Sequence, residues 1–154
     1  MGEGMAALTF QVRAEAESAT RTRAEARQFA VVIDEPPALG GTDAGANPVE
    51  YVLAAFGGCL NVMGHLIAKE KGMELRGLRI HLEGDLDPDR LFGRPTEERA
   101  GYSAIRVRLE ANTEAEPSLL EEWRREVCER CPVCDNLKHP TAVEVVVAPV
   151  ASSP

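Results

Sequence analysis

The sequence predicts an α+β domain in which antiparallel strands surround one long, apolar central helix. The first third of the chain is rich in strand patterns, a long apolar stretch from Tyr51 to Ala68 follows, and the second half adds more alternating segments and a further helix. Strands grouped before and after helices are typical of α+β proteins. A chain of 154 residues has the usual size of one domain, so we expect residues 1–154 to form a single domain.

The first third contains three predicted strands and a loop. Ala7–Ala16 alternates apolar and polar residues at a period of two, which indicates a half-buried strand. Thr20–Arg27 is polar and basic and is interpreted as an exposed second strand, and the β-branched Gln28–Asp34 as a third. Glu35–Pro48 is rich in proline, glycine, aspartate and asparagine, which predicts a loop, and loops of this length are often functional.

The central helix has clear start and stop signals. Asn47 is a suitable N-cap, Pro48 suits the first helical position, and Glu50 completes a capping box. The apolar pattern continues to about Lys71, and Gly72 is a suitable C-terminal stop. Because the helix is apolar nearly all round, we expect it at the centre of the molecule, buried in the interface of a homodimer.

Two alternating segments follow the helix. Leu75–Gly84 and Ala104–Ala111 both have the period of a strand, and the segment between them is charged and rich in turn residues. We therefore expect two strands joined by an extended surface loop.

A second helix and a last strand complete the predicted fold. Ser118 and Glu121 have the spacing of a capping box at the start of this helix. Pro132 interrupts the pattern, so the helix must kink or restart there. The chain then closes with a β-branched strand, Ala142–Val150.

Charge and composition limit the classes of partner. Acidic residues outnumber basic ones by 25 to 17, which gives a net charge of −8. Such a surface repels nucleic acid and anionic lipid, so neither is expected as a partner. Asn61, His65 and three glycines interrupt the longest apolar stretch, which favours a core helix over a membrane span. The N-terminus lacks the features of a secretion signal, so we expect a cytoplasmic protein with free cysteines.

Cys59 lies in the middle of the central helix, directly after Gly57 and Gly58. Buried cysteines often act only as small apolar residues, and that interpretation stays open. However, two glycines inside a helix cost about 1–2 kcal/mol relative to alanine. Their presence predicts that another element or a substrate approaches the helix closely here.

Three further cysteines are spaced three residues apart at the end of the second helix, and they allow three interpretations. If a helix restarts after Cys131, its free N–H groups would stabilise a thiolate there. Cys131 and Cys134 also have the C-x-x-C form of a dithiol oxidoreductase. Alternatively, Cys128, Cys131, Cys134 and His139 have the composition of a Cys₃His zinc site.

Three stretches together resemble the osmotically inducible protein C and organic hydroperoxide resistance family (OsmC/Ohr), and in particular its OsmC-like branch. A loop with the sequence GTDAGANP, Gly41–Pro48, leads into a helix that carries AAFGGCL, Ala54–Leu60. The motif CPVCDNL, Cys131–Leu137, closes a second helix. In the family pattern a cysteine follows the loop asparagine by twelve residues, which is the interval from Asn47 to Cys59 here.

The resemblance implies a cysteine peroxidase that reduces organic hydroperoxides without metal or flavin and serves the oxidative stress response. Cys59 would be the peroxidatic thiolate and Cys131 the resolving thiol, joined during turnover by a disulfide. An external dithiol, such as that of a lipoyl-bearing protein, would reduce this disulfide. The family forms intertwined dimers with the central helices packed together.

The sequence departs from the family pattern in the groups that activate the thiolate. Val49 stands where the family has a catalytic glutamate, and Glu50, one residue further on, is the candidate to replace it. The family's arginine comes from an early strand, for which Arg21 is the first candidate, followed by Arg23 and Arg27. The alternative function is a non-catalytic OsmC-like protein that binds a ligand, or zinc through its Cys128–His139 cluster.

Overall fold

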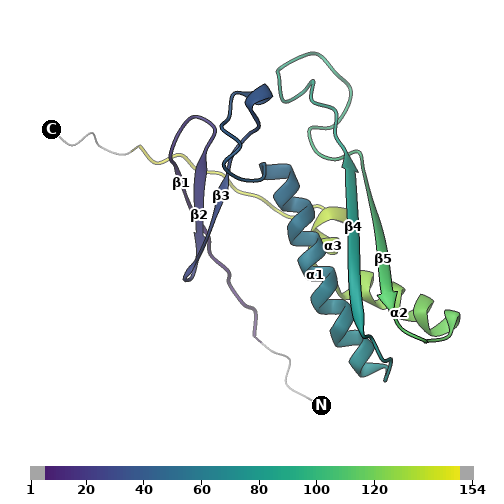
Figure 1. Ribbon diagram of the computed structural model, residues 1–154. Helices are drawn as coiled ribbons and strands as arrows, with labels where there is room; N and C mark the ends of the chain where they lie inside the picture. The colour runs from purple at the N-terminus through teal and green to yellow at the C-terminus, as the bar shows by residue number, and fades with distance from the viewer. Residues whose placement is uncertain (1–5, 150–154) are drawn as a thin grey trace. The chain divides into compact units, whose positions relative to one another are not determined.

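The computed structural model describes residues 6–149 and confirms the α+β class. The described chain contains a three-stranded sheet, a two-stranded sheet, three α-helices and a short 3₁₀ helix, Pro37–Leu39. It divides into two compact units, the first ending at Ala54 and the second beginning at Ala55 (Figure 1). Each unit is described in turn.

The first unit is built on an antiparallel sheet of three strands. These are β1 (Arg13–Ala16), β2 (Thr22–Ala26) and β3 (Phe29–Ile33), in that order across the sheet. The predicted first strand was too long, because only its last four residues pair. Arg13 already pairs with Glu25, next to the turn that leads into β3, so residues 7–12 run past the end of β2 and have no partner strand among residues 6–149.

The loop after β3 is organised by one buried carboxylate. Asp34 is fully buried, and its oxygens accept hydrogen bonds from the hydroxyl of Thr42 at 2.6 Å and from the backbone N–H groups of Glu35, Thr42 and Ala44. The Thr42 hydroxyl in particular holds the pKa of this carboxyl well below its usual range, despite the opposing effect of burial. Residues on both sides of the 3₁₀ helix Pro37–Leu39 are thereby tied together just before the long helix that follows.

The long helix α1 (Pro48–Glu70) begins as the sequence predicts. The Asn47 side chain accepts from the Glu50 N–H at 2.9 Å, and the Glu50 carboxylate accepts from the Asn47 N–H at 2.8 Å. The capping box is therefore confirmed. Gly72 follows the helix with φ of +66°, a conformation that favours glycine at this end of a helix.

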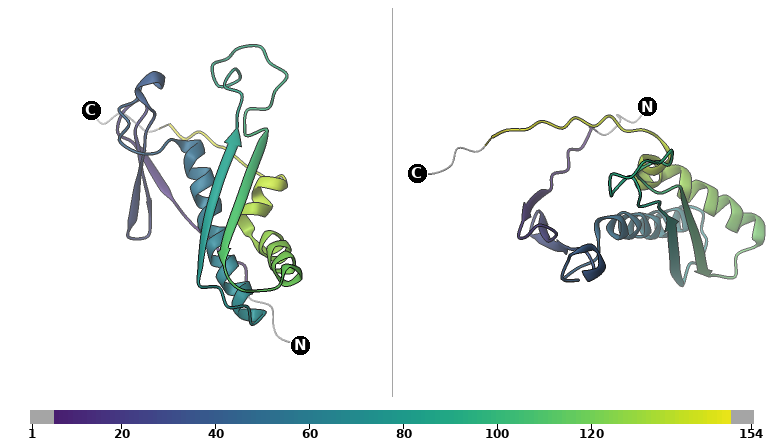
Figure 2. Two further views of the ribbon diagram at one scale, coloured as in Figure 1. Left: turned by 45° about the vertical axis from the view of Figure 1, so that its right-hand side comes forward. Right: turned by 90° about the horizontal axis from the view of Figure 1, so that it is seen from above.

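The second unit packs helices on one face of a β-hairpin. Strands β4 (Gly77–Asp85) and β5 (Ala104–Asn112) pair along their whole length, with α2 (Pro117–Arg130) and α3 (Pro132–Lys138) after them. Figure 2 shows α1, α2 and α3 behind this hairpin. Its inward-facing side chains join core residues of the helices, of which the most deeply buried are Leu60, Ile67, Ala68, Trp123 and Val127, and Cys131 between α2 and α3 is buried with them.

α1 is less buried within the chain than its sequence predicts. One face contributes Leu60 and Ile67 to the core, while Val52, Val62 and Leu66 on the other face are exposed. By length and composition alone, α1 could also span a membrane, a test that core helices pass as well.

Two local predictions need correction. Ser118 is not a helix cap, because Pro117 takes the first turn of α2 and the cap falls at Glu116, whose side chain makes no capping bond. The last strand is absent from the described residues 142–149, which are extended without a sheet partner; Val150 lies outside the described residues. A strand forms only where a neighbouring strand accepts its backbone hydrogen bonds, and the described chain offers none there.

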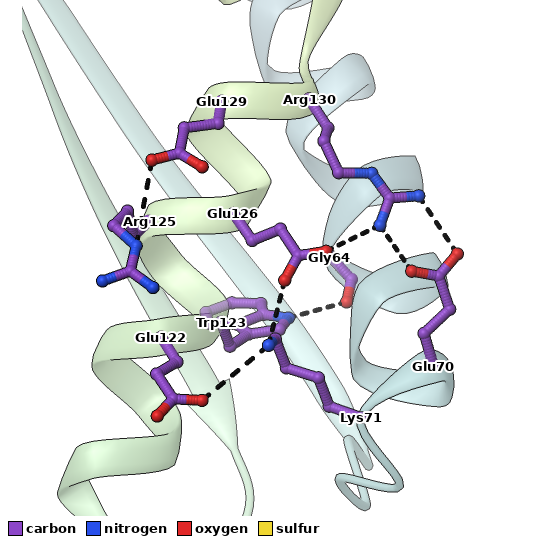
Figure 3. A network of polar contacts seen from close by, with 9 residues as sticks. All are labelled: Gly64, Glu70, Lys71, Glu122, Trp123, Arg125, Glu126, Glu129 and Arg130. Carbon is purple, nitrogen blue, oxygen red and sulfur yellow. Dashed lines mark hydrogen bonds and ion pairs between the residues drawn. The ribbon is translucent and has the colours of Figure 1, made fainter.

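Helices α1 and α2 are joined by a close contact at a glycine. The Trp123 indole N–H donates to the Gly64 carbonyl at 2.8 Å in the core (Figure 3). A Cβ on Gly64 would lie 2.8 Å from Leu78 Cδ2 and 3.2 Å from Trp123 Cζ2. Around this contact, Lys71 pairs with Glu126 at 2.9 Å. Only a residue without a side chain lets α2 and β4 approach α1 this closely.

We expect Gly64→Ala to lower the free energy of unfolding by about 1–3 kcal/mol, because the added methyl overpacks the space between Leu78 and Trp123. Leu78→Ala alone should also destabilise, but the double variant should lose less than the sum of both changes, since the second change makes room for the first. Urea unfolding of the wild type, the two single variants and the double variant measures the coupling energy between the two positions. If the losses of the single variants simply add up in the double variant, the close contact is contradicted.

Candidate functional site: a pair of thiols

The second unit brings two cysteines together that are 72 residues apart in sequence. Cys59 lies near the middle of α1, and Cys131 occupies the break between α2 and α3. This break exists because Pro132 cannot donate the backbone hydrogen bond that would continue α2, so the chain turns at Cys131 and restarts as α3. The predicted restart at Pro132 is confirmed.

The two sulfurs are in direct contact. The Cys131 thiol donates to the Cys59 sulfur at an Sγ–Sγ distance of 2.9 Å. Cys131 also accepts a hydrogen bond from the backbone N–H of Cys134 at 3.3 Å. Cys131 is fully buried and Cys59 is partly exposed, and all four cysteines are free thiols. The pair is thus placed so that a reagent can reach Cys59 while Cys131 lies behind it.

Burial controls the protonation of the inner thiols. Burial, and after it the hydrogen bond to Cys59, raise the pKa of Cys131 to about 11, against the opposing effect of the Cys134 N–H. Burial also raises the pKa of Cys134, and the nearby Cys128 adds to this effect. Cys131 is therefore a protonated thiol at neutral pH.

The glycines before Cys59 are explained in part. A Cβ on Gly57 would lie 3.1 Å from Leu82 Cδ1, so β4 approaches the helix there as predicted. A Cβ on Gly58 would meet nothing within 4 Å in the described part of the chain. Of the three glycines in α1, Gly64 has the tightest surroundings, and nothing in the sequence singled it out, since a lone helical glycine shows its role only once its neighbours are known.

The other predicted site residues lie in the first unit. Glu50 is engaged in the capping box with Asn47, and Arg21 Nε lies 2.9 Å from Glu17 Oε2. Of the alternative arginines, Arg23 pairs with Glu25 at 2.8 Å and Arg27 lies over the ring of Phe29. The assignment of any of them to activation of Cys59 stays a prediction.

The zinc interpretation of the cysteine cluster finds no support in the structure. Among residues 6–149, no group of three or more His, Cys, Asp or Glu side chains is arranged to hold a metal ion. His139 points to Asp135, with Nδ1 at 2.8 Å from the carboxylate, on the exposed side of α3.

An apolar pocket of about 510 Å³ lies between α1, α2 and β5. It is lined mainly by core side chains, among them Phe56, Leu60, Leu109 and Trp123, together with Cys128 and Arg124 at its edge. Neither Cys59 nor Cys131 lines it. The thiol pair, and not this pocket, is therefore the candidate site.

The protein is a thiol protein with an α+β fold. Its long helix α1 places Cys59 against Cys131, which directly precedes Pro132. The family model described as OsmC-like protein matches residues 41–146, which include both cysteines. The chain belongs to the OsmC family.

Solved structures support the same fold at low sequence identity. An OsmC-like protein from Mycoplasma pneumoniae is 19% identical, with a TM-score of 0.75, and the match covers 86% of this chain and 89% of that one. An organic hydroperoxide resistance protein from Legionella pneumophila is 19% identical, with a TM-score of 0.62 and coverage of 87% and 92%. One from Bacillus subtilis is 23% identical, with a TM-score of 0.57 and coverage of 86% and 93%. No curated protein matches the chain significantly.

The raised pKa of Cys131 predicts a loss of stability in alkali. The folded protein holds this proton more tightly than the unfolded chain, so the contribution is complete below about pH 9 and is lost as pH rises towards 11. In Cys131→Ala the free energy of unfolding should be lower at neutral pH but should fall less steeply between pH 9 and 11. Urea unfolding across this range measures both slopes, and parallel curves would argue against the shift.

Proposed function

We propose that the protein is a thiol-dependent peroxidase that reduces organic hydroperoxides through Cys59 and Cys131. The observation that carries the proposal is the 2.9 Å contact between the sulfurs of a partly exposed and a buried thiol. A thiol that a peroxide can reach, with a second thiol in contact, is the arrangement that a two-cysteine redox cycle needs. Membership of the OsmC family supports it, as do the relatives named organic hydroperoxide resistance proteins.

The chemistry proceeds in three steps. The Cys59 thiolate attacks the peroxide, the O–O bond breaks, and the alcohol leaves with one proton as Cys59 becomes a sulfenic acid. The Cys131 thiol then displaces the sulfenic hydroxyl as water, and the Sγ–Sγ bond forms. Finally, an external dithiol reduces the disulfide and becomes oxidised itself. A dithiol such as that of a lipoyl-bearing protein is the proposed reductant.

The roles of the charged residues belong to the same proposal. Arg21 is proposed to orient the Cys59 thiolate, and Glu50 to act in place of the glutamate that Val49 replaces. The Glu50 carboxylate already accepts from the Asn47 N–H, so in this chain it has a structural task as well. Four free thiols suit a reducing compartment, so we propose a cytoplasmic location.

Cysteine variants test the mechanism. Cys59→Ser should abolish consumption of cumene hydroperoxide in the presence of dithiothreitol, because it removes the exposed thiol of the pair. Cys131→Ser should still form a Cys59 sulfenic acid, detectable by dimedone labelling, but lose disulfide-based turnover. Cys128→Ser, which alters a half-buried cysteine outside the pair, is the matched control and should keep wild-type turnover. Full turnover by Cys59→Ser would refute the mechanism.

A homodimer is proposed on the evidence of uncovered apolar segments. Leu8, Phe10 and Val12 alternate in an extended segment without a partner strand, and Phe10 is 87% exposed. The extended residues 142–149 are equally uncovered, with Val147 at 93%. In residues 6–54 only Ala24 and Asp34 are buried, so this unit has little core of its own. A second copy that adds strands to these segments and covers the outer face of α1 would bury all of them.

Val62→Glu tests the dimer, since Val62 is 63% exposed on the outer face of α1. In a monomer this change should be harmless, whereas in the proposed interface it introduces a charge next to apolar side chains and should promote dissociation. Light scattering should give about twice 16.7 kDa for the wild type and a lower mass for the variant. Lys69→Glu, a charge change at an exposed position near the end of the same helix, is the control and should keep the wild-type mass. A wild-type mass near 16.7 kDa would exclude the dimer.

A further inference from the structure

A third cysteine lies beside the proposed redox pair and has no task in the cycle described above. Cys134 is buried, three residues after Cys131, in the first turn of α3. Its backbone N–H donates to the Cys131 sulfur at 3.3 Å. Its own sulfur is three covalent bonds from that nitrogen, and the single side-chain torsion χ1 sets its distance from Cys131.

We propose that Cys134 is a second resolving thiol, which takes over the disulfide from Cys59 by thiol–disulfide exchange at Cys131. This inference rests on the proposed function for the supply of the first disulfide. In the exchange, the Cys134 sulfur loses its proton and attacks the Cys131 sulfur, and the bond between Cys131 and Cys59 breaks. Cys59 leaves as a thiolate and takes up a proton, so no further oxidant or reductant is needed.

The placement of the three sulfurs favours this exchange. The Cys131 sulfur contacts both possible partners, Cys59 through its sulfur and Cys134 through its backbone N–H. Residues three apart in a turn have Cα atoms within about 7 Å, and a disulfide requires about 4.4–6.8 Å. A bridge within α3's first turn therefore requires only a small local adjustment.

The chemical character of Cys134 opposes breakage of a bridge that contains it. Burial raises the pKa of its thiol, and a thiol of raised pKa is a poor leaving group. A bridge that contains Cys134 therefore resists reversal. The Cys131 sulfur is in hydrogen-bond contact with the Cys59 sulfur, so the exchange follows, and does not replace, formation of the Cys59–Cys131 bridge.

The exchange returns Cys59 to the thiol form, and the disulfide is then held between Cys131 and Cys134 in the core. Cys59 is the partly exposed member of the three, whereas Cys131 and Cys134 are buried. The protein can then react with a second peroxide before a reductant arrives, and in the absence of reductant Cys59 is again open to alkylation.

The test follows the bridge with time in the full-length protein. The reduced protein is treated with one equivalent of cumene hydroperoxide, quenched in acid at intervals, alkylated, digested without reductant and mapped by mass spectrometry. In the wild type we expect Cys59–Cys131 first and Cys131–Cys134 later, with Cys59 then alkylated. Cys134→Ser, which keeps the backbone N–H, should stop at Cys59–Cys131, with alkylation of Cys59 reduced at least about tenfold.

A second oxidant and a matched variant distinguish a failure of the exchange from a failure of the proposed function. Diamide forms disulfides without peroxidase chemistry, so it tests the exchange even if the hydroperoxide does not react and the proposed function fails. Cys128→Ser removes the cysteine three residues on the other side of Cys131 and should behave as the wild type. Three outcomes would each overturn the proposal. The Cys59–Cys131 bridge could persist in the wild type, the dominant bridge could be Cys128–Cys131, or the Cys131–Cys134 bridge could form without the earlier one.

Discussion

The contact between Trp123 of α2 and the backbone of α1 at Gly64 is the constraint on which the second unit depends. The indole N–H needs a partner when it is buried, and the Gly64 carbonyl supplies one at 2.8 Å. Because Gly64 has no side chain, Leu78 of β4 can pack against the same spot. One position of α1 therefore fixes both α2 and the hairpin, and the core side chains fill the space around it.

The thiol pair is a consequence of this packing. α2 ends at Arg130, which pairs with Glu70 of α1 and with Glu126, so the end of α2 is held next to α1 (Figure 3). Exposed ion pairs contribute little stability individually, but here they fix the position of a helix end. Pro132 then stops the helix, and Cys131 is left at the break with its thiol against Cys59. Packing brings the two sulfurs together, and burial keeps the inner one protonated.

The uncovered apolar segments have a common physical origin. Residues 7–12 and 142–149 have strand patterns, yet within residues 6–149 no neighbouring strand is available to satisfy their backbone groups. The outer face of α1 is apolar without a covering element in the same described chain. A sequence pattern encodes the preference for burial, but it does not state whether the covering surface comes from the same chain or from a second copy.

Much of the fold was determined by short-range signals in the sequence. The capping box of Asn47 and Glu50 and the stop at Gly72 set the limits of α1, because caps act within one turn of the helix. The period of two located β5 to within one residue at each end, and β4 to within two. At Ser118 the same kind of signal failed, because Pro117 took the first helical position and moved the cap back by two residues.

The site itself was decided by tertiary structure. The sequence singled out Cys59 and Cys131 through local features and a family resemblance, but only packing over 72 residues of separation brings their sulfurs to 2.9 Å. The buried Asp34 and the close approach at Gly64 gave no signal in the sequence, since their roles depend on groups that reach them from other segments. Local sequence signals determine where helices and strands begin and end. The contacts between these helices and strands depend on which of their surfaces remain to be buried once they have formed.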